Sequence, residues 1–229
     1  MLKAFVVGGT GAVGSELVKL LASDPRFGQV RLVSRRKNDQ IAHEKFEEVI
    51  VDFDHLNGSA FEGMDIGFCS LGTTRKKSGV DGFIKVDHDY VVNTARLAKE
   101  NGVKQFILIS SAGANEKSYF LYTKTKGQVE REISELGFEK YVIIRPGLIE
   151  ADREESRLGE SLFKQLVKPL KLLTNSLASS ATDIARTMIK ASLSPELPSK
   201  TYWNNARVLE FAPQYQEEVD ELNLKSLSG

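Results

Sequence analysis

Tyr122 and Lys126, in the stretch YTKTK, have the residue types and the spacing that proton transfer requires. On a helix, residues four apart share a face, so Lys126 can lie beside the Tyr122 phenol. A nearby ammonium favours the phenolate form of a tyrosine, which makes it a usable proton donor or acceptor for a carbonyl or alcohol oxygen. Ser110 lies twelve residues before Tyr122, and its hydroxyl can hold the same oxygen. Together the three side chains indicate chemistry at a carbonyl or alcohol group.

A glycine-rich segment, GGTGAVG at 8–14, follows an apolar run and precedes residues with helical spacing. Gly8 permits the tight turn, Gly11 lets a pyrophosphate approach the backbone, and Gly14 lets the helix pack on the sheet. The first turn of the helix supplies N–H donors and the positive end of its dipole to the phosphates. The segment therefore predicts a dinucleotide site.

The residues after the second apolar run indicate which dinucleotide binds. An NAD site normally has Asp or Glu about 20 residues past the loop, where it bonds the ribose 2′-hydroxyl. Here Ser34, Arg35 and Arg36 occupy that place. Two guanidiniums can receive a 2′-phosphate, so we expect NADP(H) rather than NAD(H). Asp52 and residues 71–72 follow later apolar runs, where they would border the adenine and pass along the dinucleotide.

Short apolar runs alternate with helical periodicity along most of the chain. The predicted strands are 3–8, 29–34, 47–53, 65–71, 104–110 and 140–146, and the predicted helices are 12–22, 85–100, 118–136, 158–173 and 180–193. This alternation predicts an α/β fold, a doubly wound parallel sheet of the Rossmann type with its ligand crevice at the carboxyl ends of the strands. The basic stretch 75–77 is expected in a loop. We interpret 1–229 as a single domain in which 147–229 form mostly a small cap on the substrate side.

Composition excludes several other classes of protein. The 229 residues carry 31 Lys and Arg against 31 Asp and Glu, a formal net charge of zero, which argues against nucleic-acid binding. The lone cysteine, Cys69, allows no internal disulfide and favours a reducing compartment. No apolar run approaches the roughly 18 residues of a membrane span, and the three histidines show no metal-ligand spacing. We therefore expect a cytoplasmic protein without a transmembrane segment or a metal.

Longer stretches of the chain resemble a known family. They include GGTGAVG, SRR at 34–36, GFCSLGTTRKKSG at 67–79, VDHDYV at 86–91, ISSAGA at 109–114, FLYTKTKGQVE at 120–130, RPGLI at 145–149 and DREESR at 152–157. With these motifs the chain resembles an atypical short-chain dehydrogenase/reductase, and more narrowly the Tat-interactive protein family of oxidoreductases. The resemblance covers about two-thirds of the chain.

The resemblance implies roles for individual residues. Tyr122 would be the proton donor and acceptor, and Lys126 its partner and a ligand of the ribose. Ser110 would position the carbonyl, with Ser111 as the rival, because related enzymes differ in which serine they use. The implied cofactor contacts are Gly8, Thr10, Gly11, Ala12, Val13, Arg35, Arg36, Leu71, Gly72, Tyr122, Lys126, Ile149 and Arg157. Conventional members carry an Asn where this chain has Asp87, so their proton relay through that Asn is not carried over.

These observations predict an NADPH-dependent oxidoreductase that acts on a small carbonyl or alcohol. The alternative is a regulatory or scaffold protein that binds NADPH with little turnover. A weaker third interpretation is a nucleotide-sugar epimerase or dehydratase, for which about 80 residues after Gly147 leave little room. The family resemblance also implies protein partners and a peripheral association with the mitochondrial outer membrane.

Overall fold

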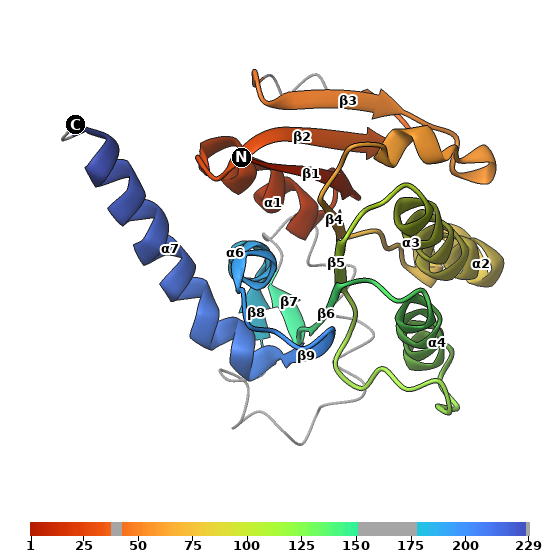
Figure 1. Cartoon of the computed structure of the whole chain (residues 1–229). Coiled ribbons are helices and arrows are strands. Elements are labelled where there is room, and N and C mark those ends of the chain that lie inside the picture. The colour runs from red at the N-terminus through yellow and green to blue at the C-terminus, as the bar shows by residue number, and fades with distance from the viewer. Residues whose placement is uncertain (38–42, 151–177, 228–229) are drawn as a thin grey trace.

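Seven parallel strands form the main sheet of the protein (Figure 1). The computed structural model describes residues 1–37, 43–150 and 178–227. The strands of the main sheet are β1 (Leu2–Val7), β2 (Phe27–Ser34), β3 (Phe46–Ile50), β4 (Ile66–Cys69), β5 (Gln105–Ile109), β6 (Lys140–Arg145) and β9 (Lys200–Asn204). The helices are α1 (Ala12–Ser23), α2 (Arg75–Ile84), α3 (Tyr90–Glu100), α4 (Leu121–Glu135), α6 (Ala181–Leu193) and α7 (Asn205–Leu227). The predicted doubly wound Rossmann fold is confirmed.

The strand order is β3-β2-β1-β4-β5-β6-β9, and every neighbouring pair is parallel. The chain runs outward from β1 to β3 and then returns to the other side of β1 with β4. In a sheet of this kind, ligands bind outside the carboxyl ends of the strands where the order reverses. That place lies between β1 and β4. The Ser70 hydroxyl joins the two strand ends there by donating to the carbonyls of Val7 and Gly8, each 3.1 Å away.

The two faces of the sheet each carry a hydrophobic core, because side chains alternate along a strand. In β1, Ala4 and Val6 face one core, together with buried residues of α1 and α6. Phe5 and Val7 face the other, together with residues of α3 and α4. Figure 1 shows this division: α1, α6 and α7 lie on one side of the sheet, and α2, α3 and α4 lie on the other.

The last part of the chain differs from the predicted cap. Residues 200–204 form β9, which pairs with β6 and extends the main sheet, and α6 packs against α1. Only Trp203 of β9 is buried, so this edge strand lacks the apolar run that revealed the other strands. A two-stranded pair, β7 (Leu148–Glu150) with β8 (Ala178–Ser180), lies outside the main sheet. The helix predicted at 158–173 lies outside the described residues.

Two further stretches differ locally from the sequence prediction. The basic stretch 75–77, expected in a loop, opens α2, where the Thr74 side chain caps the first turn. α2 is broken at Gly79, whose φ of +72° lies in the left-handed region that glycine adopts readily. The helix predicted from 85 begins with a π-helical segment, Lys85–Asp89, and continues as α3. No helix in the described part of the chain is long and apolar enough to cross a membrane.

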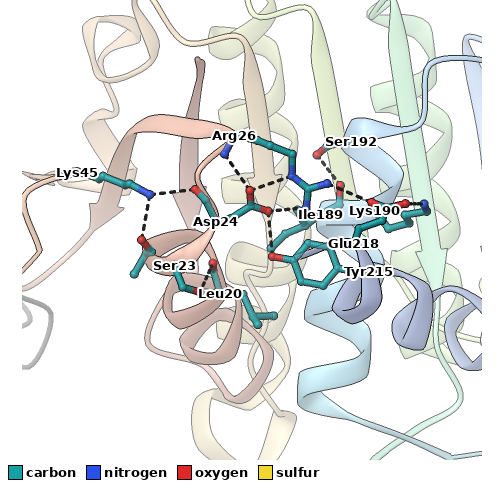
Figure 2. Close-up of polar contacts among 11 residues, drawn as sticks. Leu20, Ser23, Asp24, Arg26, Lys45, Ile189, Lys190, Ser192, Tyr215 and Glu218 are labelled. Atoms are coloured by element: carbon teal, nitrogen blue, oxygen red, sulfur yellow. Dashed lines mark hydrogen bonds and ion pairs between the residues drawn. The ribbon is translucent and has the colours of Figure 1, made fainter. Parts of the chain in front are cut away.

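A buried polar cluster fixes α7 to the body of the protein (Figure 2). Asp24, fully buried after α1, accepts from the Arg26 guanidinium at 2.7 Å and from the Tyr215 hydroxyl of α7 at 3.0 Å. Glu218 of α7 pairs with Arg26 at 3.1 Å and also with Lys190 of α6. The cluster lies just before the start of β2, at the amino-terminal ends of the strands. It therefore stabilises the fold at the end of the sheet opposite the ligand crevice.

Candidate cofactor and active site

The glycine loop packs so closely against neighbouring backbone that Gly8 and Gly14 leave no room for a side chain. Gly8 has φ +83°, and a Cβ there would lie 2.6 Å from the Ser70 carbonyl. A Cβ on Gly14 would lie 2.1 Å from the Gly8 oxygen, so this glycine lets α1 pack directly under the loop. The Gly11 N–H donates to the Gly8 carbonyl at 3.0 Å and completes the turn. The loop therefore has the shape that the sequence predicted.

The start of α1 is open for an anion. Gly11 is the N-cap and offers no side-chain cap, and the first turn carries no acidic residue. The N–H groups of a helix's first turn have no intrahelical partner and attract negative charge. Thr10 and Gly11 are exposed and Ala12 is partly exposed, whereas Val13 points into the core. The loop thus leaves backbone N–H groups at the start of α1 without a capping side chain, which is what a pyrophosphate site needs.

The end of β2 lies beside this loop. A small hollow is lined by Gly9 and Thr10 from the loop and by Ser34 from β2, among others. The Ser34 hydroxyl donates to the Arg36 carbonyl at 2.6 Å and folds the chain into a turn. Arg35 and Arg36 are both exposed there. The basic pair thus directly follows Ser34, the residue of β2 that lies beside the glycine loop.

Tyr122 and Lys126 lie one turn apart on α4. Tyr122 is 44% exposed, and its ring packs against Phe83 of α2 with the ring centroids 5.9 Å apart. Lys126 is buried, and its ammonium forms an ion pair with Asp87 at 2.8 Å. Burial disfavours the charged lysine, but the Asp87 carboxylate and the nearby Tyr122 outweigh it and raise the pKa of Lys126 above its usual value. Lys126 therefore stays a cation beside Tyr122.

Ser110 is buried and is bound to a carboxylate that sequence reasoning did not single out. Its hydroxyl donates to Glu130, a buried residue of α4. Arg145, at the end of β6, holds Glu130 through two hydrogen bonds, one of them from Nε at 2.9 Å. Glu130 follows Tyr122 by eight residues and Lys126 by four, so the spacing of α4 alone places it on the same face. Ser111 is partly exposed, and its hydroxyl donates to the Ala112 carbonyl at 3.1 Å.

The remaining predicted contacts follow β4 or lie in β7. Leu71 and Gly72 follow β4, and a Cβ on Gly72 would lie 3.4 Å from Asp87. Ile149 in β7 is 41% exposed. The Gly147 N–H, just before β7, donates at 2.9 Å to Asn205, which opens α7. Arg157, with the DREESR stretch, lies outside the described residues.

Comparison with known proteins agrees with this geometry. A model of the NAD(P)H-binding family matches residues 8–195. The chain belongs to this NAD(P)H-binding family. Protein HTATIP2 of Rattus norvegicus is 44% identical over 165 residues, which are 70% of this chain and 68% of that protein. Protein FMP52, mitochondrial, of Candida albicans is 38% identical over 172 residues, 72% of this chain and 75% of that protein. The resemblance to the Tat-interactive protein family is confirmed.

Solved structures of the same fold include an epimerase and an oxidoreductase. The UDP-glucuronic acid 4-epimerase from Bacillus cereus, in complex with UDP-glucuronic acid and NAD, superposes with a TM-score of 0.70 at 15% identity, over 89% of this chain and 77% of that chain. The oxidoreductase ylbE from Lactococcus lactis gives 0.68 at 20% identity, over 94% and 97%. At these identities the likeness concerns the fold alone.

Proposed function

We propose that this protein is an NADPH-dependent oxidoreductase that transfers hydride to or from a small carbonyl or alcohol. The observation that carries the proposal is the arrangement of Tyr122 and Lys126 on α4. The phenol is accessible to a substrate, and a buried cation lies one turn away. The open glycine loop and the exposed Arg35 and Arg36 support binding of the phosphorylated dinucleotide.

Each residue of the site has a proposed task. When bound, the nicotinamide supplies or accepts the hydride at the substrate carbon. In reduction, Tyr122 gives its phenolic proton to the substrate oxygen, so that the carbonyl becomes an alcohol, and the phenolate regains a proton from solvent. The buried Lys126 cation lies one turn away on α4, where it can stabilise the negative charge that forms on the Tyr122 oxygen as the proton leaves. An ammonium has three donors, so the bond from Lys126 to Asp87 leaves others for the ribose.

Tyr122→Phe tests the catalytic proposal. We expect NADPH oxidation with a panel of aldehydes, ketones and quinones to fall by about 10²- to 10⁴-fold, the usual contribution of a general acid. The affinity for NADPH, measured by fluorescence, should stay within about threefold, because the phenol oxygen acts mainly on the substrate. Tyr119→Phe is the matched control, since Tyr119 is fully exposed three residues away. Unchanged turnover in Tyr122→Phe would refute the role of Tyr122.

The same panel separates the alternative function. A wild-type protein that binds NADPH but reduces no compound of the panel would favour an NADPH-binding regulatory or scaffold protein. The name of the rat relative, HTATIP2, and the resemblance to Tat-interactive proteins support protein partners in either case.

We also propose a cytoplasmic location with contact to the mitochondrial surface. The unpaired, buried Cys69 and the relatives named mitochondrial support it, and cell fractionation tests it.

A further inference from the structure

The segment Lys85–Asp89 is a π-helical turn between α2 and α3. Its ring is closed by the Tyr90 N–H, which donates to the Lys85 carbonyl five residues back. Such wide turns are rare within helices, and they are found frequently at functional sites. The buried residue within this turn is Asp87, which is 2% exposed.

Asp87 uses both carboxylate oxygens, and each binds a different part of the candidate site. One oxygen accepts from the Lys126 ammonium of α4 at 2.8 Å. The other accepts from the Thr73 N–H at 2.6 Å, in the segment that follows β4. A buried carboxylate requires such partners, because an unpaired charge in the interior is strongly unfavourable. Asp87 therefore joins the predicted catalytic helix to the predicted cofactor segment 71–73.

From these contacts we infer that Asp87 is a positioning residue of the site: it keeps the buried Lys126 charged beside Tyr122 and fastens segment 71–73 to that lysine. The inference deepens the proposed function and rests on it for the role of Tyr122. Within the described part of the chain, the charged or titratable groups that act on Lys126 are Asp87 of the π-helical turn, Tyr122 of α4 and Cys69 of β4. Burial raises the pKa of the Cys69 thiol to about 12, so Cys69 is neutral at working pH. Asp87 is thus the anion that compensates Lys126.

Asp87→Asn isolates the charge of this residue. The amide keeps the shape and an oxygen acceptor for the Thr73 N–H, but it no longer balances the ammonium. We expect the Lys126 side chain, followed by ¹⁵N NMR and assigned with Lys126→Met, to lose its proton at a pH at least one unit lower than in the wild type. Asp89→Asn is the control, because Asp89 lies in the same turn, is exposed and contacts His88 instead. An unchanged Lys126 titration in Asp87→Asn would overturn the inference.

Asp87→Ala isolates the tether. This variant also removes the acceptor of the Thr73 N–H, so we expect hydrogen exchange at Thr73 to quicken at least tenfold in Asp87→Ala and to stay near the wild-type rate in Asp87→Asn. Where Asp87→Ala fails to fold, Asp87→Asn combined with Lys126→Met removes both charges and tests the pair. The double variant should be thermally more stable than Asp87→Asn alone, since no buried charge is left unpaired. Equal thermal stability of the single and the double variant would contradict a stabilising ion pair between Asp87 and Lys126.

These readouts need no substrate, so they are independent of the proposed reaction. If the protein also turns over a substrate, we expect the alkaline limb of the pH profile to move to lower pH in Asp87→Asn, because Lys126 loses its charge at lower pH there. The limb should not move in Asp89→Asn. An unmoved alkaline limb would contradict the link to Tyr122. A protein without turnover but with the expected Lys126 titration would refute the proposed function and retain the pairing.

Discussion

Arg35 and Arg36 are the residues on which the choice of cofactor is expected to depend. Both are exposed and directly follow Ser34, which lines the hollow beside the glycine loop. Replacing both by Ala should weaken NADPH binding by about 10²-fold or more, because two charge-assisted hydrogen-bond partners of the 2′-phosphate are lost. NADH affinity should change by less than about threefold, since NADH has no such phosphate. Titration of both dinucleotides checks this, and an equal loss for both would refute the assignment.

The two serines after β5 are expected to differ in their effects. The Ser110 hydroxyl is buried and donates a hydrogen bond to Glu130, whereas Ser111 is partly exposed. A serine has a single donor, so Ser110 in this arrangement can only accept a hydrogen bond from a substrate. We therefore expect Ser111→Ala to raise the KM for a carbonyl substrate more than Ser110→Ala does.

Ser110→Ala should instead lower stability, by about 1–3 kcal/mol, because a partner of the buried Glu130 is lost. Urea unfolding measures this loss next to the kinetic constants. The opposite pattern, with a larger catalytic loss in Ser110→Ala and no loss of stability, would assign the substrate contact to Ser110.

At the scale of the elements, α7 is held by side chains from distant parts of the chain. Its Tyr215 hydroxyl donates to the fully buried Asp24. Tyr215→Phe removes this donor while the ring remains, so we expect the free energy of unfolding to fall by about 1.5–3 kcal/mol, the range for a hydrogen bond to a charged group. Urea unfolding measures the change, with Tyr119→Phe as the exposed control. A loss no larger than that of the control would show that Arg26 alone satisfies Asp24.

The sequence predicted the elements whose signal is local. The six strands with apolar runs and the glycine loop were all identified, because a buried parallel strand and a strand–loop–helix turn each leave a continuous pattern. β9 was missed because only Trp203 of it is buried, and α2 because Gly79 interrupts its periodicity. Glu130 and Arg145 went unnoticed for another reason. Spacing places Glu130 on the face of α4 that carries Tyr122 and Lys126, but it does not reveal the contacts of Glu130 with Ser110 after β5 and with Arg145 of β6, which join different elements.

At the scale of the whole molecule, several buried groups make stability depend on alkaline pH. Burial raises the pKa of Cys69 to about 12 and also raises those of Tyr141 and Tyr215, the last with help from Asp24. Lys126 has a raised pKa as well, because Asp87 and Tyr122 together outweigh the effect of burial. Above about pH 9 the unfolded chain therefore holds fewer protons than the folded chain. Stability is complete below the unfolded pKa values and is lost as pH rises toward the folded ones.

We therefore expect the free energy of unfolding to be flat near neutral pH and to decline from about pH 9 upward, by at most ~1.4 kcal/mol per pH unit for each group that has begun to titrate in the unfolded chain. Cys69 starts this decline, because its ordinary pKa of 9.0 is below that of the tyrosines, 10.0. Urea unfolding at successive pH values measures it. Cys69→Ala should make the slope shallower by about half a proton at pH 9 and by about nine-tenths of a proton at pH 10. It also lowers stability at every pH by leaving a small cavity. An identical slope in the variant would mean that the Cys69 thiol ionises as readily in the folded chain as in the unfolded one.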